Sequence, residues 1–304
     1  MDSPFTHPLP RSAYFRLLEY QKNGKIDSYE PDLPLILFIS LSRVAAGLSL
    51  VSILFPESIA WSGAALGCMM LATLASIAHL SVPWRFITMA INSRSFLVWE
   101  IRMAGALGAC LGLQFLSEFA WGWLHAYRFY LSWLNFGLSI VFLFSTGWAY
   151  RFVTHPAWRT SLLPLYYLAS ALPVGLGLRS IEHPSAVVPF FFAGLLIAKG
   201  VLLSLYKNHL ETASPTSLKN VRVAKERWVF LAFLWADLLL PGLLTLALLV
   251  GGKGAVFHCL FTASCLAGIF LERVLFFRVE KPVFFLSFIG NPELDARYPY
   301  WIRG

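Results

Sequence analysis

The sequence predicts an all-α integral membrane protein, in which eight transmembrane helices form a bundle with both termini on the same side. Apolar residues (Ala, Val, Ile, Leu, Met, Phe, Trp, Tyr and Cys) make up 58% of the 304 residues, and charged residues only 13%. A soluble domain is about half apolar and about a quarter charged. The apolar residues also gather into eight runs, each long enough to cross a hydrocarbon layer of about 30 Å. Together these observations exclude an ordinary soluble enzyme, a disordered protein and a disulfide scaffold.

The eight runs follow one another along the chain with polar connections between them. The fifth run is the weakest because it contains Pro164 and Pro173, although membrane helices tolerate proline. The chain therefore divides into a polar N-terminal extension (1–31), a transmembrane domain (32–278) and a polar C-terminal tail (279–304). The expected runs are about 33–55, 58–81, 95–120, 128–150, 160–178, 185–206, 227–250 and 254–278.

The distribution of lysine and arginine predicts the orientation of the bundle. Of the 24 such residues, 17 fall on the face that carries both termini, 3 on the opposite face and 4 within the runs. Because positively charged loops stay in the cytoplasm, we expect both termini to be cytoplasmic. A second interpretation of the same excess is a docking surface for an acidic partner. The charges lie in loops between membrane spans, so we read the net charge of +8 as a sign of topology and docking rather than of nucleic-acid binding.

Seven ionisable side chains lie inside the apolar runs, and His79 lies at the end of the second run. An ionisable group at membrane depth is costly, so each is a candidate for function, for proton relay or for pairing with another. All lie near the midplane or in the half nearer the termini, which predicts a polar site open toward the basic face. Arg43 and Asp237 lie at similar depth and are candidates for an ion pair. The seven residues are Arg43, Glu100, Arg102, Lys199, Asp237, Glu272 and Arg273.

No metal, haem or hydrolytic site is evident in the sequence. His79 and His258 fall near opposite faces, whereas a haem held by two histidines needs them at one depth, so no haem is expected. No HExxH, GxSxG or P-loop pattern occurs, and we assign no catalytic residue to this chain. The cysteines lie in apolar runs without Cys-x-x-Cys spacing and are expected to be core residues: Cys68, Cys110, Cys259 and Cys265.

Five short motifs occur in a consistent order along the chain. The first run opens on an acidic-x-Pro-Leu motif in DLPLILFISLSRVAAGLSL (32–50). A His-Leu-x-x-Pro-x-Arg turn and an Arg-Ser-aromatic-Leu-x-x-Glu entry follow in ASIAHLSVPWRFITMAINSRSFLVWEIRMAG (75–105). The last two motifs lie in AYRFVTHPAWRTSL (149–162) and LERVLFFRVEKP (271–282). In this order they resemble the DmsC family, the membrane anchor subunits of dimethyl-sulfoxide-reductase-type molybdoenzymes.

The resemblance implies one subunit of a heterotrimeric complex in the cytoplasmic membrane of a prokaryote. Such anchors hold an iron–sulphur, ferredoxin-like subunit and a molybdopterin catalytic subunit against the bilayer, and they react with menaquinone or ubiquinone. Molybdopterin and iron–sulphur clusters are expected only in those partners. The family's quinol-handling histidine and glutamate fall on His79 and Glu100, and its basic loop positions fall on Arg85 and Arg94. These four residues are therefore the predicted quinone-binding set.

The chemistry of these residues suits a quinone site, and several alternatives stay open. Histidine titrates near neutral pH, which suits proton exchange at His79. Alternatively, His79 bonds the last carbonyls of its helix, and Glu100 pairs with Arg43 or Arg94. With cytoplasmic termini, we expect a cytoplasm-facing, quinone-reducing complex that resembles sulfite dehydrogenases. The alternatives are the anchor of a periplasmic, quinol-oxidising reductase and, in other classes, a secondary transporter, a stand-alone membrane enzyme or a scaffold.

Overall fold

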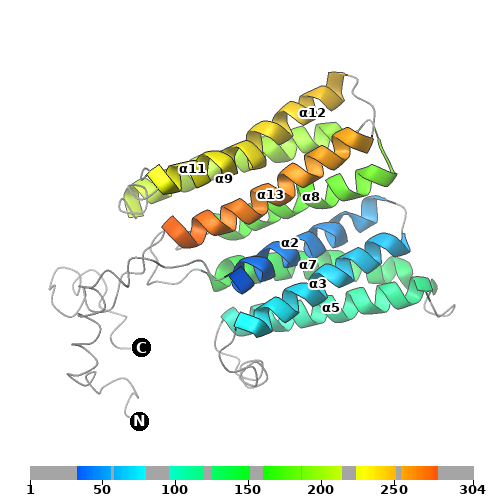
Figure 1. Cartoon of the computed structure of the whole chain (residues 1–304). Coiled ribbons are helices and arrows are strands. Elements are labelled where there is room, and N and C mark those ends of the chain that lie inside the picture. Colours follow the sequence, from blue (N-terminus) through cyan, green and yellow to red (C-terminus); the bar gives the residue numbers. More distant parts are fainter. Residues whose placement is uncertain are drawn as a thin grey trace, which may run out of the picture.

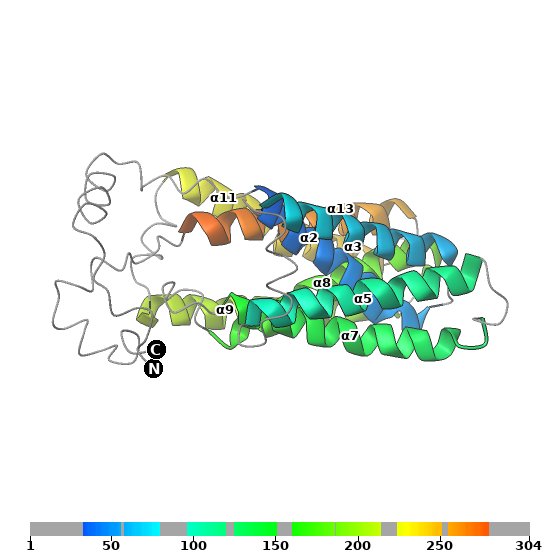
Figure 2. The ribbon, with the colours of Figure 1, turned by 90° about the horizontal axis from the view of Figure 1, so that it is seen from below.

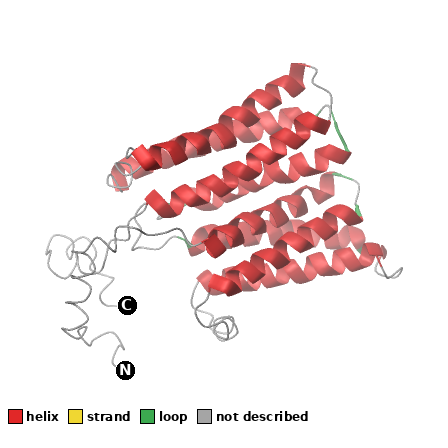
Figure 3. Ribbon diagram, in the orientation of Figure 1, coloured by secondary structure: helices red, strands yellow, loops and turns green. Residues whose placement is uncertain are grey.

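The computed structural model describes residues 33–55, 58–79, 96–119, 125–150, 160–185, 187–213, 224–250 and 255–279. Within these ranges all regular structure is helical, as the composition predicts (Figures 1 and 3). The predicted extension 1–31 and residues 280–304 of the predicted tail lie outside them. The helices are α2 (Leu33–Val51) with a 3-10 turn η1 (Ser52–Leu54), α3 (Ile59–His79), α5 (Phe96–Phe119), α7 (Arg128–Ala149), α8 (Leu162–Glu182), α9 (Val188–Ala213), α11 (Ala224–Leu234), the π-helical turn η3 (Trp235–Leu239), α12 (Leu240–Val250) and α13 (Ala255–Val279).

Among the described residues, seven helical segments are long and apolar enough to cross a membrane, one of them formed by most of α11 with η3 and α12. Helix α5, expected as the third of eight spans, is not among them. It contains three charged residues, Glu100, Arg102 and Glu118. It has 24 residues and lies beside the other helices in the bundle (Figure 1). The seven segments are Leu33–Leu54, Ile59–Ala78, Arg128–Ala149, Leu162–Glu182, Val188–Glu211, Arg227–Val250 and Ala255–Phe277.

Two helices extend well beyond the runs predicted for them. Helix α8 continues to Glu182 with Pro173 inside it, where the sequence predicted an end near residue 178. Helix α9 continues to Ala213 rather than to about residue 206. Its last turns read YKNHLETA, a polar sequence that contains several good helix formers. Hydropathy detects where a helix leaves the apolar layer but not where the helix ends.

The helices form two layers of four, if α11, η3 and α12 are counted as one long helix. One layer holds α3, α2, α13 and α11–α12 in that order, and the other holds α5, α7, α8 and α9 (Figure 2). The N-terminal end of α2 and the C-terminal end of α13 lie at the same end of the bundle (Figure 1). We call this the near end, and the end that holds η1 and the start of α13 the far end.

The layers place α2 at the centre of the molecule. It packs against α3, α7, α8 and α13, and all of its residues from Ser42 to Val51 are buried. Small residues permit close contact with α8, since a side chain on Gly47 would meet the backbone of Ala171, and one on Gly175 would meet the backbone of Gly47. Close approach of helix backbones through small residues is a common packing mode in membranes. The central position of α2 carries Arg43 into the interior.

Candidate functional site

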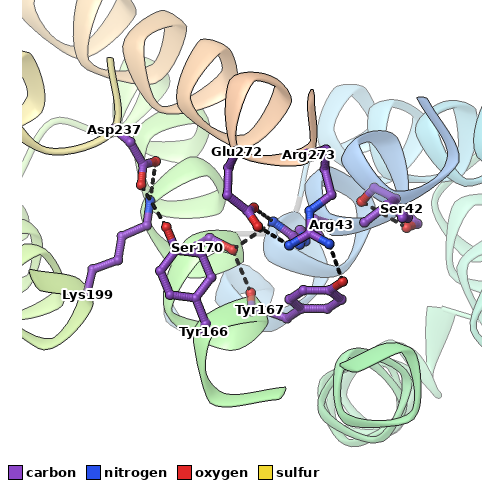
Figure 4. Close-up of polar contacts among 10 residues, drawn as sticks. Ser42, Arg43, Tyr166, Tyr167, Ser170, Lys199, Asp237, Glu272 and Arg273 are labelled. Atoms are coloured by element: carbon purple, nitrogen blue, oxygen red, sulfur yellow. Dashed lines mark hydrogen bonds and ion pairs between the residues drawn. The ribbon is translucent and has the colours of Figure 1, made fainter. Parts of the chain in front are cut away.

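A cluster of polar side chains lies where α2, α8 and α13 meet. The carboxylate of Glu272 bridges two guanidinium groups in this arginine cluster (Figure 4). One carboxylate oxygen accepts a hydrogen bond from Nη1 of Arg43, and the other accepts one from Nη2 of Arg273. Both arginines are almost completely buried, with 1% and 0% of their surfaces exposed. The negative charge of Glu272 therefore compensates each guanidinium group inside an apolar bundle, as buried ions require.

Helix α8 supplies the remaining members of the arginine cluster from successive turns. The ring of Tyr167 lies against Arg43, with 3.8 Å between the guanidinium carbon and the ring centroid. Its hydroxyl oxygen accepts a hydrogen bond from Nη1 of Arg273. The hydroxyl of Ser170 lies 3.3 Å from Nη1 of Arg43 and also donates to the carbonyl of Tyr167 at 3.0 Å. The guanidinium carbon of Arg273 also lies over this ring, 4.6 Å from its centroid, so Tyr167 contacts both arginines through its ring and Arg273 through its hydroxyl as well.

The arginine cluster contains more positive charge than negative charge. Two guanidinium groups share the single carboxylate of Glu272, which leaves a net charge of about +1 if all three are ionised. In the described part of the chain, Nε and Nη2 of Arg43 and Nε of Arg273 have no hydrogen-bond partner. These unused donors and the excess charge suit an electron-rich oxygen atom.

A second ion pair joins α9 to the π-helical turn η3. Nζ of Lys199 and Oδ1 of Asp237 form it, and each side chain is only 1% exposed. The hydroxyl of Tyr166 donates to the other carboxylate oxygen at 3.1 Å (Figure 4). The expected pair between Arg43 and Asp237 is thus replaced by pairs of each with another residue. The two lie at similar depth, but α8 and α13 separate α2 from α11–α12.

The π-helical turn has an identifiable cause in the sequence. Pro241 lacks an N–H group, and its ring clashes with the carbonyl four residues earlier, at Asp237. The widened turn is stabilised by α13, where the hydroxyl of Ser264 donates to the carbonyl of Ala236 at 2.6 Å. Gly268 of α13 lies against Asp237, and a side chain there would collide with it. Such π turns inside helices frequently occur at functional sites.

Glu100 lies away from the arginine cluster and from the pair of Lys199 and Asp237. It is in the first turns of α5, at the near end of the bundle. It is 1% exposed, and neither carboxylate oxygen has a hydrogen-bond partner among the described residues. It faces Thr146 on α7 and interacts electrostatically with Tyr150, which also interacts with Arg43 and Arg273. The pairing of Glu100 with Arg43 that the sequence left open is therefore not formed. The other suggested partner, Arg94, lies outside the described residues.

The other predicted site residues are only partly placed. His79 is the last residue of α3, at the end of the bundle where α5 begins (Figure 1). Arg85 and Arg94 lie outside the described residues. Arg102 is half-buried on α5, two residues beyond Glu100. Of the residues expected to pair or to relay protons, the structure brings together Arg43, Glu272 and Arg273 in one group and Lys199 and Asp237 in another.

Sequence reasoning missed the uncharged polar residues of the site. Tyr166 and Tyr167 each bond an ionised group, but aromatic residues are common in every apolar run, so nothing distinguished them. Ser170 was equally inconspicuous. The available signal was their depth, because the tyrosines lie about five residues inside the fifth helix, as Glu100 does in the third.

Within the described ranges, no group of three or more His, Cys, Asp or Glu side chains is arranged to hold a metal ion. His258 lies at the far end of the bundle and shares a 2.7 Å hydrogen bond with Ser180. The four cysteines are free thiols, of which Cys110 and Cys265 are buried and Cys259 is exposed.

No protein-family model matches the chain, and no curated protein matches it. Function is therefore inferred from the chemistry of the site and from the short motifs in the sequence.

Proposed function

We propose that this chain is the quinone-reactive membrane anchor subunit of a heterotrimeric molybdopterin oxidoreductase. It passes electrons between the membrane quinone pool and an iron–sulphur subunit, whose partner is the molybdopterin catalytic subunit. The observation that carries the proposal is Glu100, a carboxyl group that is buried, without a hydrogen-bond partner among the described residues, and located in a motif that resembles the DmsC family.

Quinone chemistry explains why such a carboxyl group is useful. Reducing a quinone to a quinol adds two electrons and two protons, and oxidation releases them. The electrons travel through the iron–sulphur subunit, so the anchor has to supply or accept the protons and to hold the ring. Glu100 exchanges a proton at its carboxylate oxygens. His79, which ends α3 at the same end of the bundle, exchanges the second at its imidazole nitrogen.

The arginine cluster supports this assignment by its charge. Its excess positive charge and its unused donors on Arg43 favour the electron-rich oxygens of a reduced ring. The cluster reaches the neighbourhood of Glu100 through aromatic contacts. The guanidinium carbon of Arg273 lies 4.2 Å from the ring centroid of Phe276, and that ring packs edge-on against Tyr150 at 6.2 Å. Tyr150 in turn interacts with Glu100.

The proposal includes a topology of eight spans with both termini in the cytoplasm of a prokaryote. Helix α5 supplies the eighth span, because it has the length of its neighbours and runs beside α7. The excess of Lys and Arg at the near end favours a cytoplasmic location, and with it a quinone-reducing complex that resembles sulfite dehydrogenases. The alternative, a periplasmic quinol-oxidising reductase, requires the opposite orientation. A reporter fused after the last residue separates them, since a periplasmic C-terminus contradicts the cytoplasmic assignment.

The first test is the composition of the complex. The tagged chain is extracted in mild detergent, and the purified material is assayed for molybdenum, iron and accompanying subunits. We expect an iron–sulphur protein and a molybdopterin subunit. A chain that purifies alone and without metal, under conditions that preserve other membrane complexes, contradicts the proposal.

The second test concerns the site within an assembled complex. The substitution Glu100→Gln should lower quinone-linked turnover by about a hundredfold or more, the usual contribution of a proton-transferring group. His79→Ala should do the same. The matched control is Ser145→Ala on α7, which removes a hydroxyl that bonds only its own helix, at the carbonyl of Phe142. Unchanged turnover in the Glu100 and His79 variants, with normal assembly, contradicts the site.

One observation favours a second candidate function, a secondary transporter. Transporters often contain interrupted helices with charged groups near the middle of the membrane, and η3 interrupts α11–α12 at the buried pair of Asp237 and Lys199. This candidate predicts a chain that functions without metal-containing partners. Co-purification therefore distinguishes the two functions directly.

A further inference from the structure

A line of buried polar side chains follows the contact between α5 and α7. These helices run antiparallel and pack along their lengths (Figure 1). From Ser132 to Thr146 the line rises through 14 residues, or about 21 Å at the helical rise of 1.5 Å per residue. That is most of a hydrocarbon layer of about 30 Å. We call this set the α5–α7 seam, and it consists of Glu100, Gln114 and Glu118 on α5 and of Ser132, Asn135, Ser139 and Thr146 on α7.

The far half of the seam is joined by hydrogen bonds. Asn135 donates from Nδ2 to Oε1 of Gln114 at 2.5 Å, and Gln114 donates from Nε2 to the hydroxyl of Ser132 at 3.3 Å. Beside Gln114 and Glu118 lies a cavity of about 20 Å³ whose lining includes Ser49, Ser62 and Arg179. A polar cavity of this size has room for one water molecule. The seam therefore begins at the far end in a place where water can bind.

The near half of the seam is polar but lacks hydrogen bonds within the described residues. The atoms without partners are Oδ1 of Asn135, Oγ of Ser139, Oγ1 of Thr146 and both carboxylate oxygens of Glu100. All four residues are at most 1% exposed. In a membrane interior each such group is unfavourable unless something bonds it. Water molecules between the helices would satisfy all of them.

Helix association alone does not explain this pattern. Asn and Gln side chains commonly bond across membrane helices, and Gln114 and Asn135 do so. Ser139 bonds nothing across this contact within the described residues, and Thr146 lies beside the carboxyl group of Glu100. Several hydroxyl groups elsewhere in the bundle bond the carbonyls of their own helices, as Ser145 and Thr73 do at 2.8 and 2.9 Å, whereas Ser40 and Ser49 on α2 bond nothing within the described residues.

On α7 the line of polar side chains has one apolar interruption, and on α5 the buried residues between Glu100 and Gln114 are apolar. Phe142 is fully buried between Ser139 and Thr146, which are seven residues, or about 10 Å, apart along the helix. A chain of a few water molecules covers such a distance.

We propose that the α5–α7 seam is a proton path that connects Glu100 with the far face of the membrane. Protons pass between hydroxyl groups, amide groups and bound water, and a proton taken up at the far face ends on a carboxylate oxygen of Glu100. The reverse transfer releases it at the far face. No electron moves, so the path operates without quinone or partner subunits and goes beyond the function proposed above.

Within the described ranges, few other titratable groups lie near Glu100. Helix α7 and the residue after it present Thr146 and Tyr150, and α3, the other helix packed on α5, ends at His79. Arg43 and Arg273 act on Tyr150 from α2 and α13. The seam contains two described carboxyl groups, Glu118 at its far end and Glu100 at its near end, and a proton that crosses the seam from the far face ends on Glu100.

The experiment asks which face of the membrane sets the protonation of Glu100. A hydrophobic carbodiimide reacts with carboxyl groups in their protonated form, and mass spectrometry measures the labelled fraction of Glu100. The full chain is prepared without quinone in inside-out and right-side-out membrane vesicles, whose orientation is checked by proteolysis of a terminal tag. An acidic medium is placed on one face and an alkaline medium on the other, and the two are then exchanged.

In the wild-type chain, labelling of Glu100 should follow the pH at the far face, by up to about tenfold for each unit of pH. The substitutions Asn135→Leu and Ser139→Val should abolish this response. Ser139→Thr keeps a hydroxyl and should retain it, and Ser145→Ala, which alters a hydroxyl outside the seam, should also retain it.

Labelling that follows only the pH at the near face, that responds to neither face, or that still follows the far face in Asn135→Leu and Ser139→Val overturns the proposal. If a variant fails to fold, the labelling of the wild-type chain still tests whether Glu100 exchanges protons with the far face. Failure here leaves the quinone proposal untouched, because no quinone is present.

Discussion

At the scale of single residues, one buried carboxylate compensates the charges of two buried arginines. Glu272 is the partner of two buried guanidinium groups, Arg43 and Arg273. Neither arginine has a second carboxylate partner in the described part of the chain. Removing one member of a buried ion pair is strongly destabilising because the remaining charge stays uncompensated.

The substitution Glu272→Gln tests this role. We expect a loss of about 3–5 kcal/mol in the free energy of unfolding, measured by denaturant titration in detergent with circular dichroism. The matched control is Glu211→Gln, which breaks an exposed i,i+4 pair with Lys207 of 3.7 Å and should cost roughly 0–1 kcal/mol. Equal effects of the two substitutions would contradict the assigned role of Glu272.

Tyr167 gives a second prediction at this scale, because its ring and its hydroxyl have separate roles. Tyr167→Phe keeps the ring against Arg43 and removes the oxygen that accepts from Arg273. We expect a loss of about 1.5–3 kcal/mol in unfolding free energy, the usual range for a hydrogen bond to a charged group. Tyr130→Phe, at a side chain that is 68% exposed, should leave the same unfolding curve unchanged.

At the scale of elements, the π-helical turn connects a proline to an ion pair. Pro241 widens the helix at Asp237, and Lys199 from α9 compensates the charge of Asp237 there. The pair therefore ties α9 to α11–α12 at the edge of the bundle. If the link stabilises the fold through charge, the effects of substituting Lys199 and Asp237 on the free energy of unfolding should depend on each other.

A double-mutant cycle measures that coupling. Lys199→Met leaves Asp237 buried without its cation and should cost about 3–5 kcal/mol in unfolding free energy. Adding Asp237→Leu should recover most of that loss, since an apolar pair often replaces a buried ion pair without penalty. If the double variant is as unstable as Lys199→Met, the charge of Asp237 is not the cause.

The elements also indicate how far sequence reasoning reaches in this protein. Hydropathy located each apolar run, and ionisable residues such as Arg43 and Lys199 were identified because they stand out from apolar surroundings. The partners were not identified, because depth along a helix says nothing about which helices are neighbours. Arg43 and Asp237 share a depth but lie on helices separated by α8 and α13. The uncharged groups of the α5–α7 seam, such as Ser139 and Asn135, were missed because only ionisable residues at membrane depth were taken as candidates.

At the scale of the whole molecule, the bundle consists of two similar halves. Helices α2, α3, α5 and α7 form one group of four, and α8, α9, α11–α12 and α13 form the other. In each group the first and last helices lie at the centre of the molecule and the middle two at its edge (Figures 1 and 2). The sequence shows no convincing repeat, so this order is visible only in the arrangement. The halves meet at α2 and α8, where Arg43 and Tyr167 lie.

The contact between the halves depends on two glycines, and this gives the last prediction. A side chain on Gly47 would collide with the backbone carbonyl of Ala171, and one on Gly175 with that of Gly47. Backbone cannot move aside as a flexible side chain can, so Gly47→Ala should cost about 1–3 kcal/mol in unfolding free energy. Gly194→Ala is the control, because its added carbon meets nothing within 4 Å and alanine favours a helix by about 0.5–1 kcal/mol.

Since Gly47 lies one turn beyond Arg43 on α2, its substitution should also weaken the arginine cluster. Gly47→Ala and Glu272→Gln should then destabilise the protein less in combination than the sum of their separate effects. Strict additivity would mean that the contact between the halves and the arginine cluster are energetically independent.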